Sequence, residues 1–121
     1  MPCLSQEKPA LLGYKIKKSD IFEAAMTHQE FLDSTQLDAP PQNIQGPLLA
    51  LWLDRTGDWE KAHNTAQSLE SEVGAWIHAY LHRKEGDALN AQYWYSRAAK
   101  PECRLSLDEE WTEITKAILS A

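Results

Sequence analysis

Two histidines and a glutamate, His78, His82 and Glu85, recur at helical spacing within one short stretch of the sequence. If this stretch is helical, a rotation of about 100° per residue places the three side chains within an arc of about 60°. Imidazole and carboxylate groups in that arrangement are typical ligands of a divalent metal, or typical members of an acid–base pair. His63 is expected on the side of its own helix that faces this stretch, so it is a further candidate ligand.

The same histidines also have a purely structural interpretation, and both are kept. In it, His78 and His82 pack against a partner helix and hydrogen-bond Tyr95, Asn90 or backbone carbonyls. That interpretation predicts a protein without bound metal or any other cofactor. The sequence has no glycine-rich phosphate loop, no G-x-S-x-G or H-E-x-x-H motif and no cysteine metal site, so enzymatic activity is not indicated.

Helical periodicity begins at residue 19 and predicts one all-α domain over residues 19–121, preceded by an irregular arm over residues 1–18. A first helix is expected over residues 19–33, with Asp20 as its N-cap. Adjacent prolines make residues 34–46 a loop.

Two helical hairpins are predicted over residues 47–101, each turning at a Gly-Asp pair: Gly57-Asp58 and Gly86-Asp87. Glycine supplies a left-handed C-cap and aspartate accepts from the free amides of the next helix. The final segment is expected to form a capping helix.

The C-terminal capping segment spans residues 102–121. Its helix is predicted to begin at Asp108, with Glu109 and Glu110 as helix-terminus or solvated charges that favour the positive helix N-terminus.

The two hairpins are related by a shift of 29 positions, the separation of Gly57 from Gly86. This shift also aligns Ala50 with Ala79, Asp58 with Asp87 and Ala62 with Ala91. The pattern resembles the tetratricopeptide repeat, and the second unit matches that motif best, at Ala79, Gly86, Ala91, Tyr95 and Ala98. The resemblance covers Leu48 to Pro101, although the period is shorter than the family's value of about 34. The block Trp76 to Asp87 is also similar to bacterial proteins of unknown function, which implies no activity.

The resemblance implies a compact, right-handed stack of about five helices, in which the first and last helices cover the apolar ends of two TPR-like repeats. The first helices of such hairpins line a concave face. Here that face would present Trp76, Tyr80, Arg83 and Lys84 to a protein partner. The resemblance therefore favours a small protein–protein interaction module, and the alternative is a small-ligand or divalent-metal binding protein, or an enzyme, that uses His78 and His82.

Composition limits the partners and the location. The net charge of −6 disfavours nucleic-acid binding, which depends on clustered basic residues. No apolar run approaches the roughly 20 residues that span a bilayer. Cys3 and Cys103 belong to no cysteine framework, so we expect a cytoplasmic monomer or homodimer in a reducing compartment.

Overall fold

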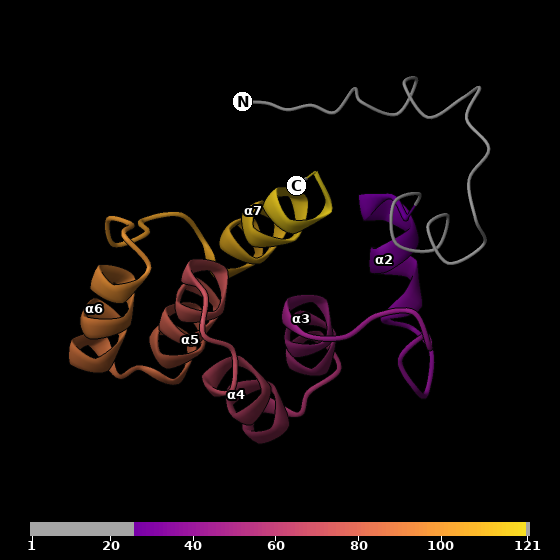
Figure 1. Cartoon of the computed structure of the whole chain (residues 1–121), viewed down its shortest axis with the longest axis horizontal. Helices are drawn as coiled ribbons and strands as arrows, with labels where there is room; N and C mark the ends of the chain where they lie inside the picture. The colour runs from indigo at the N-terminus through magenta and orange to yellow at the C-terminus, as the bar shows by residue number, and fades with distance from the viewer. Residues whose placement is uncertain (1–25, 121) are drawn as a thin grey trace.

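Six helices and no strand make up the part of the chain that the computed structural model describes, residues 26–120 (Figure 1). They are α2 (His28–Ser34), α3 (Pro47–Arg55), α4 (Trp59–Gln67), α5 (Glu72–Glu85), α6 (Ala88–Arg97) and α7 (Leu107–Leu119). The all-α class is confirmed. The expected total of about five is one too few, because two hairpins and a helix on either side of them already make six. Among the described residues, no helix combines the length and apolar character that crossing a membrane requires.

The first described helix is shorter than predicted. Thr27 is its N-cap, and a capping box joins the Thr27 hydroxyl to the Glu30 amide at 3.0 Å and the Thr27 amide to the Glu30 carboxylate at 2.9 Å. Met26 and Thr27 are not helical, so one continuous helix over residues 19–33 is wrong. The proposed Asp20 cap and the arm over residues 1–18 lie outside the described residues.

Both hairpins turn with the same local geometry. Gly57 and Gly86 have φ angles of 98° and 91°, in the left-handed region that residues with a Cβ rarely adopt. Asp58 and Asp87 follow as N-caps, and each accepts a hydrogen bond from a backbone amide in the first turn of the next helix. The shift of 29 positions thus has a structural counterpart at the turns. The likeness to tetratricopeptide repeats remains a prediction, since turn geometry alone does not define that family.

Helix α7 packs across α3 and α5, the first helices of the two hairpins, and also contacts α2 (Figure 1). Trp111 is fully buried, stacks on Phe31 with ring centroids 5.7 Å apart, and donates from Nε1 to the Leu51 carbonyl at 3.1 Å. The layer formed by α3 and α5 is therefore covered by the chain's own last helix.

A buried carboxylate fastens α7 to the second hairpin. Glu110 is 0% exposed and accepts hydrogen bonds from Trp76 Nε1 at 3.0 Å, Tyr95 Oη at 2.6 Å and the Arg83 guanidinium at 2.7 Å. Burial, followed by the hydrogen bond to Glu110, raises the pKa of Tyr95. Glu110 lies in the first turn of α7, as expected of a helix-terminus charge, but it is buried and not solvated, because its carboxylate accepts hydrogen bonds from side chains of α5 and α6.

Candidate metal centre

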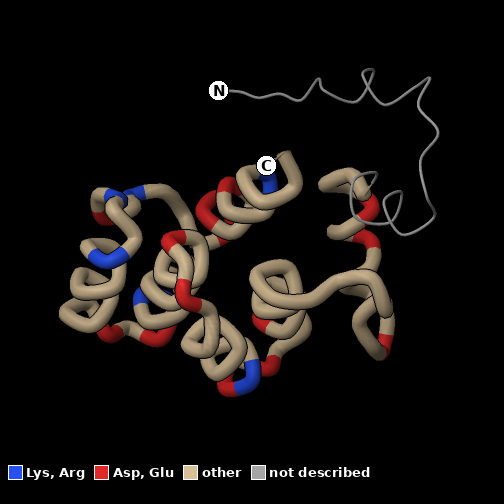
Figure 2. The backbone as a smooth tube through the Cα atoms, viewed as in Figure 1, with Lys and Arg blue, Asp and Glu red and all other residues tan. Residues whose placement is uncertain are grey.

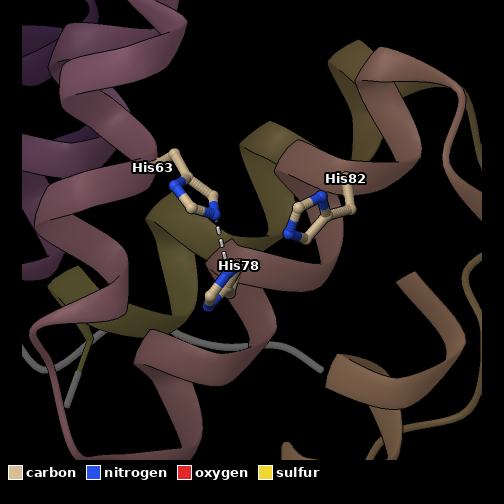
Figure 3. A group of neighbouring side chains, drawn as sticks. All are labelled: His63, His78 and His82. Carbon is tan, nitrogen blue, oxygen red and sulfur yellow. Dashed lines mark hydrogen bonds between the residues drawn. The ribbon is translucent and has the colours of Figure 1, made fainter. Parts of the chain in front are cut away.

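Three imidazole rings meet at the seam between the two hairpins (Figure 3). His63 comes from α4, and His78 and His82 come from successive turns of α5. The Nε2 atoms of His63 and His78 lie 2.9 Å apart, and the three ring centroids are separated by 4.5, 4.9 and 5.0 Å. One candidate ligand atom from each ring lies within 4.8 Å of the other two.

Local packing explains why α4 comes so close to α5. Ala62 and Ala66 are buried, and side chains this small let neighbouring helices approach closely. Trp59, one turn before His63, donates from Nε1 to the Leu81 carbonyl at 2.9 Å. This bond ties the start of α4 to α5 and fixes the rotation of α4 that points His63 at the other histidines.

Two tryptophans form the apolar walls of the site. Trp59 stacks on His63 with centroids 4.9 Å apart, and Trp94 stacks on His78 with centroids 3.9 Å apart. His78 and His82 are 2% and 7% exposed, whereas His63 is partly exposed. The rings are therefore held in fixed planes, and solvent reaches the site on the His63 side.

Electrostatics keep His78 neutral at physiological pH. Burial first, and then the neighbouring His63 and His82 rings, lower the pKa of His78 to about 4. A neutral imidazole retains the nitrogen lone pair that a metal needs, whereas a protonated ring cannot bind one. The environment thus prepares His78 to act as a ligand without first losing a proton.

Glu85 is a neighbour of the cluster that orients one of its rings. Its Oε2 lies 2.8 Å from His82 Nδ1, and an ionised carboxylate can only accept, so Nδ1 carries the hydrogen. In the neutral form of the ring this tautomer leaves the lone pair on His82 Nε2. A carboxylate behind a metal-binding histidine fixes the ring and increases its basicity. Glu85, a candidate ligand by sequence, lies where it supports a ligand instead.

The expected hydrogen bonds of the structural interpretation are not the ones formed. His78 pairs with His63, and His82 pairs with Glu85, while Tyr95 donates to Glu110. The histidine nitrogens therefore pair with each other and with a carboxylate, while the rings stack on Trp59 and Trp94. This difference arises because α4 supplies the ring nitrogen that pairs with His78, while α6 supplies the Trp94 ring that stacks on it.

The residues predicted to bind a partner are engaged within the chain. Tyr80 is 2% exposed and donates to Asp54 Oδ2 at 2.8 Å, and Lys84 Nζ donates to Asp54 Oδ1 at 2.8 Å. Burial, then the Asp54 carboxylate, raises the pKa of Tyr80. Trp76 and Arg83 both donate to the carboxylate of Glu110 on α7. The side chains of Trp76, Tyr80, Arg83 and Lys84 therefore lie close together as expected. They face α3 and α7 of the same chain, not an open surface.

Some members of the site escaped the sequence analysis, although signals for them exist. Trp59 precedes His63 by one turn, which places both on one helix face. Asp54 follows an apolar run in α3 and pairs with Tyr80 and Lys84, beside and not within the histidine cluster. The contact of Trp94 with His78 depends on how α6 packs on α5, which no local pattern contains.

The chemistry open to this centre follows from its donor atoms. Among the described residues the cluster offers imidazole nitrogens and no thiolate, a set that suits Zn²⁺, Cu²⁺ or Ni²⁺ rather than Ca²⁺ or Mg²⁺. Three protein ligands leave a fourth position of a tetrahedral ion for water or a substrate. Comparisons with protein-family models, curated proteins and solved structures find no match to this chain.

Proposed function

We propose that this chain binds a divalent transition metal through His63, His78 and His82, with Glu85 orienting His82. The observation that carries the proposal is the convergence of three imidazole ligand atoms within 4.8 Å. Zinc–nitrogen bonds of about 2.0–2.1 Å at the tetrahedral angle place two ligand nitrogens about 3.3 Å apart. The 2.9 Å pair of His63 and His78 needs to open by only a few tenths of an ångström.

The hydrogen bonding of the buried imidazole nitrogens supports the same proposal. Buried polar groups cost free energy unless they find partners. His63 and His78 share one hydrogen bond between their facing nitrogens, and only one of the two can donate it. A bound cation would accept a lone pair from each of these nitrogens and from His82 Nε2, so it would satisfy three groups at once.

Protein binding at Trp76, Tyr80, Arg83 and Lys84 ranks second. A partner on that face would have to displace α7, which is held there by Trp111 and by the buried Glu110. Metal binding needs no such rearrangement.

A reducing, cytoplasmic setting is part of the proposal, since two cysteines outside any framework favour it.

The test uses full-length protein that carries no histidine tag and has been freed of metal by chelator dialysis. Titration with Co²⁺ or Zn²⁺, followed by visible absorption and calorimetry, should give one ion per chain. Co²⁺ should show the intense visible bands of a tetrahedral site. Replacement of His63 or His78 by alanine should remove the bands and weaken binding by at least a hundredfold.

The fourth histidine of the chain provides the matched control. His28 lies on α2, and its ring contacts Trp111, away from the cluster. The His28→Ala variant should bind the ion as the unchanged chain does. If the His63→Ala and His28→Ala variants give the same titration, or the unchanged chain shows no saturable site, the proposal is wrong.

A further inference from the structure

Trp59 contacts one ring of the histidine cluster from each hairpin. It stacks on His63 with ring centroids 4.9 Å apart, and it meets His82 edge to face with centroids 6.0 Å apart. Its indole nitrogen donates to the Leu81 carbonyl of α5 at 2.9 Å. Trp59 therefore reaches across the seam from α4 and is fastened to α5 by a hydrogen bond.

Access to the ring nitrogens differs between the two sides of the cluster. His78 and His82 are buried in the middle of α5, and Trp94 of α6 stacks directly on His78. His63, which faces them from α4, is the partly exposed member of the three (Figure 3). An ion that enters from solvent therefore has to pass His63 and Trp59, the tryptophan stacked on it.

Charge draws a cation toward this side of the cluster. Glu60 follows Trp59 directly, and Leu81, which accepts the Trp59 hydrogen bond, lies one turn before Glu85. Exposed acids therefore stand at the start of α4 and, as Glu85 and Asp87, at the turn from α5 to α6 (Figure 2). Fixed negative charge raises the local concentration of a divalent cation. The ion thus arrives where Trp59 covers the cluster.

We propose that Trp59 is the gate of the metal centre, a role that rests on the metal binding proposed above. In the closed state its stack and its bond to the Leu81 carbonyl hold His63 against His78. For an ion to enter or leave, Trp59 breaks that bond and swings outward together with His63, while the two ligands on α5 stay in place. Opening lies on the path in both directions, so the gate sets the rates of binding and release but not the affinity.

Stopped-flow absorption of the full-length chain measures both rates. Mixing metal-free chain with Co²⁺ gives the rate of binding, and mixing loaded chain with excess chelator gives the rate of release. Trp59→Phe keeps a ring beside His63 but removes the N–H donor to Leu81. Both rates should rise together, by roughly 2- to 12-fold, the factor that corresponds to the usual net contribution of one hydrogen bond. The dissociation constant and the cobalt spectrum should stay unchanged.

The matched control is Trp94→Phe, at the tryptophan on the buried side of the cluster, which should not raise the two rates together. If Trp59→Phe loses its helical circular dichroism spectrum, Trp59→Leu, which also lacks the N–H, takes its place with the same expectation. Unchanged rates overturn the gate, and so does faster release alone with weaker affinity, the sign of a loosened site. Either result leaves the metal centre standing, whereas an unchanged chain that binds no Co²⁺ overturns both proposals.

Discussion

At the scale of single residues, the role of Glu85 can be separated from that of the ligands. Glu85 Oε2 lies 2.8 Å from His82 Nδ1, and Glu85 is not a member of the group of ligand atoms formed by His63, His78 and His82. Glu85→Gln removes the negative charge but keeps the size, so His82 should remain in place as a less basic, less firmly oriented ligand. We expect the affinity for Co²⁺ to fall by about 10- to 100-fold while one ion per chain still binds.

The control for this prediction is Glu72→Gln, at an exposed glutamate at the start of the same helix. Its cobalt titration should overlay that of the unchanged chain. If Glu85→Gln binds cobalt as tightly as Glu72→Gln, the carboxylate does not orient His82. Complete loss of binding would instead make Glu85 a direct ligand.

The lowered pKa of His78 predicts how stability depends on pH in the metal-free protein. The unfolded state takes up a proton at a pKa near 6.5, but the folded state does so only near 4. Between these values the unfolded state binds more protons, so the free energy of unfolding falls as the pH falls. We expect His78 to contribute a loss of about 2–3 kcal/mol over that window.

Urea unfolding at a series of pH values, compared with a His78→Gln variant, isolates this contribution. The variant removes the titrating group but keeps a polar side chain of similar length. Its free energy of unfolding should therefore decline less steeply between pH 6.5 and 4. Parallel curves for the two proteins would show that His78 titrates normally.

At the scale of helices, the packing of α7 on the second hairpin depends on one buried acid, Glu110. Glu110→Ala would leave the donors of Trp76, Tyr95 and Arg83 without their common acceptor in the seam. We expect the free energy of unfolding to fall by about 3–5 kcal/mol, the usual cost of removing one partner of a buried ion pair. Glu113→Ala, at an exposed site on α7, should change it by no more than about 0.5 kcal/mol. Similar denaturation midpoints for the two variants would contradict this account.

The helices also show how much of the fold could be predicted from the sequence. Periodicity and the two Gly-Asp pairs located both hairpins, because caps and turns are set by a few adjacent residues. The start of α2 was missed although the Thr27 and Glu30 capping signal is local. The burial of Glu110 depends on contacts with residues 15 to 34 positions away, which no local pattern contains.

For the site, helix geometry grouped His78 with His82, and the repeat register suggested the direction of His63. The depth of burial, the tryptophan walls and the role of Glu85 required the packing of α4, α5 and α6 together. Periodicity identifies which residues share a face, but it does not identify the element that covers the face. For that reason the side chains expected to receive a partner turned out to be engaged by α3 and α7.

At the scale of the whole molecule, the candidate ion would join the two hairpins. His63 belongs to the first hairpin, whereas His78 and His82 belong to the second, so a metal bond would add a further bridge between hairpins already joined by hydrogen bonds from Trp59 to Leu81 and from Tyr80 and Lys84 to Asp54. An unfolded chain has no preformed site, and binding therefore stabilises the folded state by mass action. Zinc at a hundred times its dissociation constant would add about 2.7 kcal/mol.

For a domain of this size, that gain should raise the melting temperature by roughly 10 °C. Thermal unfolding of the metal-free chain with and without Zn²⁺ measures the shift, which should vanish in His63→Ala and persist in His28→Ala. Because His63 is the one ligand from the first hairpin, its loss would leave any residual ion bound to α5 alone, where it bridges nothing. A variant that keeps weak binding but loses the thermal shift would thus separate the bridging role from binding itself. An equal shift in both variants would show that zinc stabilises the fold from a different place.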